Sequence, residues 1–349
     1  MKAKVIIRNF GPVHDIDIEI RKFNILIGPH ASGKSTISKV LCVIHSFDYA
    51  ISFASKGTRD AELLKQFLVY YRIENFHNAN TYWFFEDDLL KFELKDAKIS
   101  IIHKKNLDET SRQMESYYFP AERIALPMIS ESLFELNLSD SPLPKYFLQF
   151  GNDFIKAKKE QKIFNLSLLD LEFQYSNGKD LITLRNNKDL LLEETSSAIQ
   201  ANLPLLVILQ YPIKTASLFV IEELELHGFP LLQKKLFYYV IERMKHPKLK
   251  KSYLMLPTHS PYLLSAANNL LFAGKMGKQQ EKDADNIIPN GSWIEPEKFS
   301  AYYISEGTAK SIVDKETGLI HENELDTVSE DLASEFDSLM QVYKPMTND

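Results

Sequence analysis

The segment that most constrains this chain covers residues 28–35, which read GPHASGKS and fit the pattern G-x-x-x-x-G-K-[ST]. An apolar run at residues 23–27 precedes it, and residues 36–54 follow with the periodicity of a helix. The glycines let the backbone curl so that successive N–H groups face an anion, and the start of the helix adds its positive dipole end. This strand–loop–helix order therefore predicts a phosphate-binding loop in a parallel α/β fold.

The side chains of this loop predict how a nucleoside triphosphate would be held. Lys34 is expected to reach the β- and γ-phosphates, and the hydroxyl of Ser35 is expected to bind Mg²⁺. A glycine turn that binds nothing would leave the ammonium group of Lys34 in an empty ring of amides, so we favour the phosphate site. The expected nucleotide contacts are Gly28, Pro29, His30, Ala31, Ser32, Gly33, Lys34, Ser35 and Thr36.

A phosphate loop of this kind needs a second strand whose carboxylates hold the metal and orient water. Residues 217–223 read SLFVIEE and supply such a strand. Taken alone, an acidic residue at a strand end is usually only solvated. Beside the phosphate loop, the pair predicts a Mg²⁺ ligand in Glu222 and a general base in Glu223.

The next apolar strand, residues 253–257, ends in Thr258, His259 and Ser260. Polar residues at the carboxyl end of a strand in an open parallel sheet lie at the ligand crevice. A lone histidine in this place often caps or packs a helix instead. Together with the loop and the two glutamates, His259 is predicted to contact the γ-phosphate.

Composition limits the class of protein. The chain has 349 residues, a formal net charge of −6 and 44% hydrophobic residues, as expected for a globular protein of two or three domains or of one large domain with an insertion. Its apolar runs are too short to cross a bilayer, and its N-terminus lacks the apolar core of a signal peptide, so we expect no membrane contact. The single cysteine, Cys42, fits a cytoplasmic location and lies on the apolar face of the predicted helix.

Three stretches of the chain differ in composition and in hydrophobic periodicity. Residues 1–54 combine two alternating strands with the phosphate loop, residues 55–190 are charged and aromatic and predict a mixed insertion, and residues 191–349 return to alternating strands and helices. The dipeptide Asn-Gly at residues 177–178, between two alternating runs, predicts a β-hairpin in the insertion. Pro204 is expected to kink or interrupt a later helix.

Six segments together resemble the ABC-type ATPases of the SMC, RecF and OLD-like branch. In its general sequence character, the chain also resembles the compact bacterial AAA family ATPases of antiphage systems. The resemblance covers residues 1–50 and 190–310, and the middle of the chain matches only at residues 118–123. The segments are IRNFGPVHDIDIEI, FNILIGPHASGKST, YFPAER, SSAIQ, VIEELELH and THSPYLL.

The resemblance implies an α/β fold: a P-loop NTPase of the ABC-ATPase head type, with an N-terminal antiparallel β-subdomain and a mixed α+β insertion. It also implies ATP and Mg²⁺ as cofactors. Such heads form a homodimer or higher oligomer by head-to-tail pairing, which buries ATP between the P-loop of one subunit and the signature segment of the other. Residues 28–36 would be the Walker A loop, Glu222 and Glu223 the Walker B acid and base, and His259 the switch histidine.

The signature segment would contact the nucleotide of the partner through Ser196, Ser197 and Gln200. Serines suit the start of a helix, whose N-terminus attracts an anion. Ala198 stands where the family usually has glycine, so its Cβ would crowd the γ-phosphate. Two residues are candidates for the glutamine that contacts Mg²⁺ in the family, Gln66 and Gln113.

Two other nucleotide-binding classes fit the sequence less well. A GTPase would carry an Asn-Lys-x-Asp guanine reader, and residues 187–189 lack that spacing. A small-molecule kinase would rarely carry a pair of glutamates and a separate Thr-His-Ser.

The partners stay open at this stage. A Toprim nuclease is not expected, because Asp283 and Asp285, the one D-x-D pair after Ser260, lie in a polar stretch that predicts a solvated loop. The resemblance then implies the regulatory ATPase of a defence or DNA-maintenance system, or a nucleotide-gated scaffold with little turnover, that controls a separately encoded effector. The basic run at residues 245–251 is most simply a solvated turn, so DNA is neither required nor excluded.

Overall fold

The computed structural model describes residues 2–53, 60–104, 115–129, 143–186, 188–211, 216–276, 280–321 and 333–340. Its centre is an 11-stranded sheet. In order across the sheet, the strands are β6 (Lys98–His103), β5 (Leu90–Lys95), β4 (Tyr82–Glu86), β1 (Lys2–Phe10), β2 (Val13–Arg21), β15 (Thr308–Ser311), β14 (Phe299–Ser305), β3 (Phe23–Ile27), β13 (Tyr253–Thr258), β12 (Ala216–Ile221) and β7 (Glu115–Phe119).

The sheet has a parallel half and an antiparallel half. Strands β14, β3, β13, β12 and β7 all run parallel, whereas β6, β5, β4, β1 and β2 alternate in direction. β3 and β13 are buried at every position, as expected for strands covered on both faces. The expected α/β fold with an N-terminal antiparallel part is therefore confirmed.

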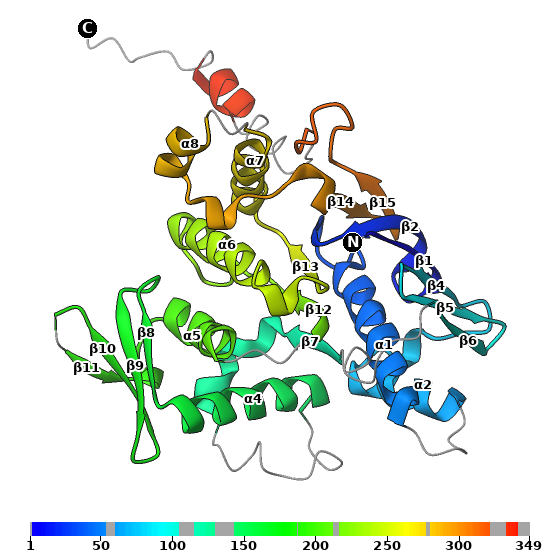
Figure 1. Ribbon diagram of the computed structural model, residues 1–349, viewed down its shortest axis with the longest axis horizontal. Coiled ribbons are helices and arrows are strands. Elements are labelled where there is room, and N and C mark those ends of the chain that lie inside the picture. Colours follow the sequence, from blue (N-terminus) through cyan, green and yellow to red (C-terminus); the bar gives the residue numbers. More distant parts are fainter. Residues whose placement is uncertain are drawn as a thin grey trace, which may run out of the picture.

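Helices cover the parallel half on both sides. Helix α1 (Lys34–Phe53) lies on one side of β12 and β13, and α6 (Pro230–Met244) and α7 (Pro261–Lys275) lie on the other (Figure 1). None of the helices in the described residues is long and apolar enough to cross a membrane. The remaining elements of this part are α2 (Asp60–Tyr70), α8 (Glu281–Ile287), and the 3-10 helices η1 (Glu74–Phe76), η5 (Pro247–Leu249), η6 (Asn290–Ser292) and η7 (Pro296–Lys298).

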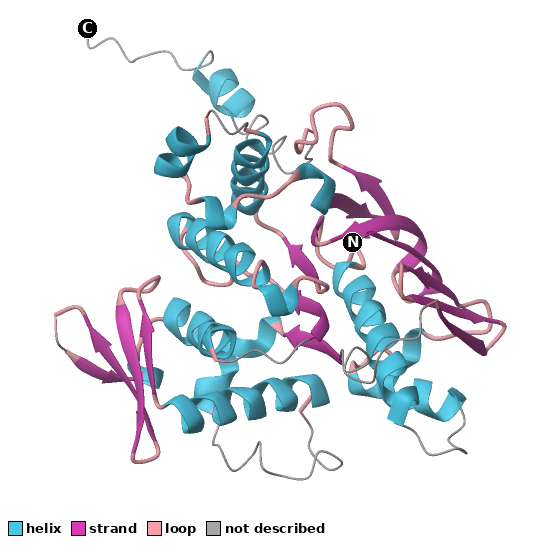
Figure 2. Cartoon of the chain, viewed as in Figure 1, coloured by secondary structure: helices cyan, strands magenta, loops and turns pink. Residues whose placement is uncertain are grey.

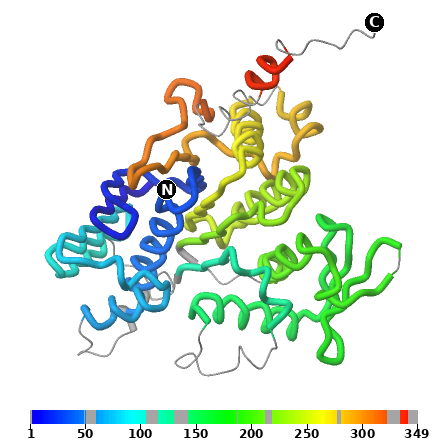
Figure 3. The backbone as a smooth tube through the Cα atoms, turned by 180° about the vertical axis from the view of Figure 1, so that it is seen from behind, coloured from blue at the N-terminus to red at the C-terminus, as the bar shows by residue number. Residues whose placement is uncertain are grey.

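A second, smaller layer lies beside the edge strand β7. Figure 2 and the reverse view in Figure 3 show helices α4 (Lys145–Gln161) and α5 (Ser197–Gln210) between the large sheet and a four-stranded antiparallel sheet. Strands of this sheet follow in the order β11 (Asp189–Leu191), β10 (Lys179–Leu184), β9 (Leu171–Ser176) and β8 (Ile163–Leu166), and the 3-10 helices nearby are η3 (Ala121–Met128) and η4 (Leu192–Glu194).

Local predictions within this layer differ in outcome. The hairpin is confirmed, because β9 and β10 pair antiparallel around Asn177 and Gly178, which both have positive φ angles. The interruption at Pro204 is wrong, because α5 continues through it. Residues 200–209 of this helix are all buried, so tertiary packing offsets the hydrogen bond that proline cannot donate.

Residues 55–190 contribute to both layers. Strands β4, β5, β6 and β7 belong to the large sheet, whereas α4 and β8 to β11 form the smaller layer. The division of the chain at residues 54 and 190 remains a prediction. The segment with Asp283 and Asp285 is a correction, since it forms the exposed helix α8 and not a loop.

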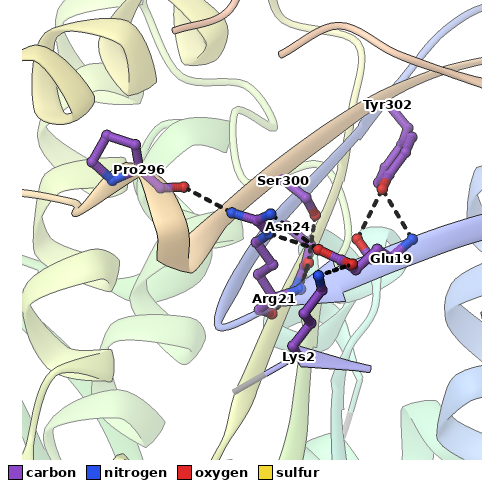
Figure 4. A network of polar contacts seen from close by, with 7 residues as sticks. All are labelled: Lys2, Glu19, Arg21, Asn24, Pro296, Ser300 and Tyr302. Carbon is purple, nitrogen blue, oxygen red and sulfur yellow. Dashed lines mark hydrogen bonds and ion pairs between the residues drawn. The ribbon is translucent and has the colours of Figure 1, made fainter. Parts of the chain in front are cut away.

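A polar network joins the end of β2 to β14, two strands that do not pair with each other (Figure 4). The side-chain oxygen of Asn24 accepts hydrogen bonds from the backbone N–H of Arg21 (2.6 Å) and the hydroxyl of Ser300 (2.7 Å). The hydroxyl of Tyr302 accepts from the backbone N–H of Glu19 (3.0 Å) and donates to its carbonyl oxygen (2.8 Å). These contacts link β2 and β14 in addition to the short strand β15 that lies between them.

Candidate nucleotide site

The predicted site residues lie at the carboxyl ends of three neighbouring parallel strands. β3 leads into the loop before α1, β12 leads into Glu222 and Glu223, and β13, which lies between them, leads into His259. Because these strands are parallel, their carboxyl ends meet at one edge of the sheet. The structure therefore brings together the side chains that the sequence assigned to phosphate, metal and water.

The loop at residues 28–33 has the backbone of a phosphate cradle. Gly28 has a φ of +150°, and a Cβ at this position would overlap the carbonyl oxygen of Ile304 on β14. Among the described residues, the backbone N–H groups of residues 30–36 have no hydrogen-bond acceptor. The hydroxyl of Ser32 is buried and also has no partner there. These free donors fit an anionic ligand.

Lys34 folds back over this loop. Its Nζ atom donates to the carbonyl oxygens of Gly28 (2.9 Å) and Pro29 (2.7 Å). Burial lowers the pKa of Lys34 to about 8, against the opposing effect of the three carboxylates of residues 222–225. The ammonium group is thus held at the loop by weak acceptors, and a phosphate would be a stronger partner for it.

Glu222 has the properties of a metal ligand. It is buried, and its Oε1 atom has no hydrogen-bond partner among the described residues. Its backbone N–H donates to the carbonyl of Phe119 (3.0 Å), which fixes β12 against β7. A buried carboxylate oxygen without a partner and the exposed hydroxyl of Ser35 are hard oxygen ligands, and they fit Mg²⁺.

Glu223 occupies a strained turn. Its φ angle is +44°, a region that residues other than glycine rarely adopt. Its backbone N–H donates to Pro257 (3.0 Å) and its carbonyl oxygen accepts from Leu226 (2.9 Å), so the turn is held from both sides. The half-buried carboxylate of Glu223 lies at the same edge of the sheet as Lys34, and the two charges interact.

His259 and His30 stack on each other, with ring centroids 4.0 Å apart and planes inclined by 30°. Burial, and then the positive charges of Lys34 and His30, lower the pKa of His259 to about 4, although a hydrogen bond to the backbone of Gly28 opposes the shift. The imidazole of His259 is therefore neutral at physiological pH, with a single N–H that contacts the backbone of Gly28 and would have to exchange this carbonyl for a phosphate oxygen.

Glu225 is a site residue that the sequence argument missed. Its Oε1 atom accepts from the hydroxyl of Thr258 (2.7 Å) and from the backbone N–H of His259 (2.8 Å). Its Oε2 atom is buried and has no partner among the described residues. The available signal was a third glutamate two positions after Glu223.

The predicted signature residues lie on a different element. Ser196 precedes α5 as its N-cap residue, Ser197 begins the helix, and both side chains are exposed. Gln200 is buried, and its amide donates to the carbonyls of Glu193 (3.0 Å) and Thr195 (2.8 Å). In the described part of the chain, no hydrogen bond joins these residues to residues 28–36.

The other residues that the sequence singled out differ in outcome. Gln66 is exposed on α2, and Gln113 lies outside the described residues. The basic run at residues 245–251 comes directly before β13, so it lies at the opposite end of the sheet from the loop. Cys42 is buried, and burial raises the pKa of its thiol to about 12, as expected for a structural cysteine.

Comparison with known proteins gives distant structural likenesses only. No family model matches the chain, and no curated protein matches it. The SMC head domain from Thermotoga maritima has 14% identity and a TM-score of 0.41 over 88% of this chain and 97% of its own. The recombination mediator protein RecF has 10% identity and a TM-score of 0.42 over 89% and 98%. An ATP-binding cassette bound to ADP and Pi has 10% identity and a TM-score of 0.36 over 88% and 96%. At TM-scores below 0.5, these likenesses carry no conclusion about function.

Proposed function

We propose that this chain is an ATPase of the ABC type, which binds ATP with Mg²⁺ and hydrolyses it to ADP and phosphate. The observation that carries the proposal is the set of unpartnered groups at one edge of the sheet: the free N–H groups of residues 30–36, the hydroxyl of Ser32 and the Oε1 atom of Glu222. Groups of this kind are costly to leave without partners, and a triphosphate with its metal would satisfy all of them.

Each residue has a distinct role in this reaction. Residues 28–36 bind the phosphates, and Lys34 leaves its carbonyl partners to neutralise the β- and γ-phosphates. Ser35 and Glu222 hold Mg²⁺, which when bound neutralises phosphate charge. The carboxylate of Glu223 accepts a proton from the attacking water as the bond between the γ-phosphorus and the bridging oxygen breaks.

His259 completes the site as a neutral donor. Because its pKa is held near 4, it stays uncharged where Lys34 already supplies a positive charge. Its one N–H would exchange the backbone carbonyl of Gly28 for the γ-phosphate, and the stacked ring of His30 together with Glu225 fixes its position. The nucleotide therefore contacts elements from all three strand ends.

We propose further that ATP assembles a homodimer. Ser196 and Ser197 are exposed at the start of α5 and are not bonded to the P-loop of their own chain in the described residues, so a second copy can present its nucleotide to them. Gln200 would hold this segment in place through its hydrogen bonds to the carbonyls of Glu193 and Thr195. The biological setting that the sequence resemblance suggests is the cytoplasm, as the regulatory ATPase of a defence or DNA-maintenance system with a separately encoded effector.

A scaffold with little turnover is the second candidate, and Ala198 favours it. Its Cβ stands where the family usually has glycine and would keep the partner's γ-phosphate at a distance, so that ATP could close the dimer without rapid hydrolysis.

The experiment uses Glu223→Gln, with Glu297→Gln as an exposed control at the other end of the sheet. We expect Glu223→Gln to bind ATP normally, to lose about 10²-fold or more in turnover, and to sediment with ATP as a dimer. Ser197→Arg should stay monomeric under the same conditions. Wild-type turnover in Glu223→Gln would refute its role as the base, and a dimer with negligible wild-type turnover would favour the scaffold.

A further inference from the structure

Arg123 lies at the centre of an unusual buried junction. It is fully buried in η3, directly after β7, and its guanidinium group donates only to backbone carbonyls. Nε binds the carbonyl of Ala201 (3.0 Å), Nη1 binds those of Pro120 (3.0 Å) and Glu222 (2.7 Å), and Nη2 binds that of Glu223 (2.7 Å). One side chain thus joins η3, helix α5 and the turn that carries the metal ligand and the base.

Asn202 makes a second link between α5 and the turn that follows β12. It is fully buried on α5, and its amide donates to the carbonyl of Ala198 one turn back (2.9 Å) and to that of Leu226 (3.3 Å). Leu226 in turn donates to the carbonyl of Glu223. Two independent side chains, Asn202 on α5 itself and Arg123 on the neighbouring η3, therefore tie α5 to residues 222–226.

Burying the positive charge of Arg123 in this junction costs solvation free energy. Burial lowers its pKa to about 10, and the carboxylates of residues 225, 223, 222 and 122 only partly oppose that shift. A buried charge is weak evidence for stability, since well-packed apolar residues often serve as well. What a guanidinium group provides and an apolar residue cannot is a planar set of donors that fixes several carbonyls at defined angles.

We propose that Arg123 and Asn202 are positioning residues that couple the two nucleotide sites of the dimer. This inference rests on the proposed function. In a head-to-tail pair, the start of α5 contacts the nucleotide of the partner, whereas residues 222–226 of the same chain serve its own nucleotide. When α5 contacts the ATP of the partner, it shifts. Arg123 and Asn202 transmit this shift to the strained turn at Glu223, and the movement of the turn aligns the base with the ATP bound to the same chain.

The test is the ATP dependence of hydrolysis by the full chain. Arg123→Lys keeps the charge but loses the planar donors, and Asn202→Leu removes the second link at similar volume. We expect the wild type to hydrolyse ATP with a Hill coefficient between 1 and 2, the limit for two sites, and both variants to fall to 1. Their affinity for ATP under monomeric conditions should stay within about twofold of the wild type, because neither residue touches residues 28–36.

Matched controls separate coupling from simple loss of structure. Arg243→Lys removes a bond from an arginine to the carbonyl of Leu209, at the far end of α5 (2.6 Å). Asn268→Leu removes the bonds of an asparagine on α7 to the backbone of Ile320. Both controls should retain the wild-type Hill coefficient, even where they lower the melting temperature.

Three outcomes would overturn the inference. The first is a wild-type Hill coefficient of 1, the second is cooperativity that survives in Asn202→Leu or in a folded Arg123→Lys, and the third is an equal loss in the controls. If Arg123→Lys does not fold, Asn202→Leu decides. Failure of the proposed function is recognised separately, because then the wild type itself shows neither hydrolysis nor ATP-dependent dimerisation.

Discussion

Two buried lysines lie at opposite ends of the same central strand. Lys22 comes directly before β3, and Lys34 follows the loop after it. Lys22 donates to two carbonyls at the 3-10 turn η5 (3.0 and 3.3 Å), and Lys34 donates to two carbonyls of the P-loop (2.9 and 2.7 Å). Burial lowers the pKa of each to about 8. By these local measures the two residues are nearly equivalent.

The two lysines differ in the charge of their neighbours and in whether the surrounding backbone groups have hydrogen-bond partners. The carboxylates of residues 222–225 surround Lys34, whereas Lys298, Lys245 and Lys250 lower the pKa of Lys22 further, and only Glu295 opposes them. Lys22 completes the hydrogen bonds of a finished turn, while Lys34 lies in a loop whose own N–H groups lack acceptors in the described structure. A buried lysine with a lowered pKa therefore marks a site only where unpartnered donors surround it.

The largest expected difference between the two lysines is in ATP binding. Lys34→Ala removes a cation from the β- and γ-phosphates, and charge-assisted hydrogen bonds of this kind contribute about 1.5–3 kcal/mol. We expect the affinity for ATP with Mg²⁺ to fall about 10- to 100-fold, as measured by calorimetry. Lys22→Met should bind ATP as the wild type does. Equal losses of ATP affinity in both variants would mean that the substitutions act through stability and that Lys34 has no special role in binding.

The sequence predicted the Lys34 end of this comparison and not the Lys22 end, for a physical reason. The residues of the P-loop act through their own backbone and side chains over nine consecutive positions, so their spacing carries the information. Glu222, Glu223 and His259 were predicted because each follows an apolar strand. The network around Lys22 depends on η5, which is more than 220 positions away in the chain, and no local pattern reports such a contact.

The same distinction explains the residues that were missed. Glu225 acts by bonding to Thr258 and His259 on the next strand, and Arg123 acts by bonding to α5 and to the turn after β12. Both depend on the strand order, which the sequence alone does not reveal. The interruption predicted at Pro204 shows the opposite error, since a correct local rule was overridden by the packing of residues 200–209, which are all buried.

A smaller effect is expected in the protons exchanged on binding. In the free chain, Lys34 has a pKa of about 8, so roughly half of it is deprotonated at that pH. The phosphates of ATP favour the charged ammonium and raise this pKa. Binding at about pH 8 should therefore take up roughly half a proton more in the wild type than in Lys34→Arg, whose guanidinium stays charged. Calorimetry in buffers of different ionisation enthalpy measures this difference.

Lys22→Met is the control for this proton uptake, because Lys22 lies far from the phosphates and keeps its pKa when ATP binds. It should show the same uptake as the wild type. No difference between wild type and Lys34→Arg would show that the ammonium of Lys34 is already fully charged before ATP arrives.

The smallest expected effect concerns stability against pH without nucleotide. A lysine whose pKa is about 8 in the folded chain and about 10.4 when unfolded binds more protons in the unfolded chain between those values. The free energy of unfolding therefore rises with pH over this window, by at most about 1.4 kcal/mol per pH unit for one group. Urea denaturation at about pH 8, 9 and 10 should give a shallower rise for Lys22→Met than for the wild type. Saturating ATP with Mg²⁺ should remove the share of the slope due to Lys34, because the bound phosphates restore its pKa, and leave the share due to Lys22 unchanged. If ATP instead removes both shares, or Lys22→Met leaves the slope intact, the two ends of β3 do not differ in the way that their hydrogen bonds and surrounding charges indicate.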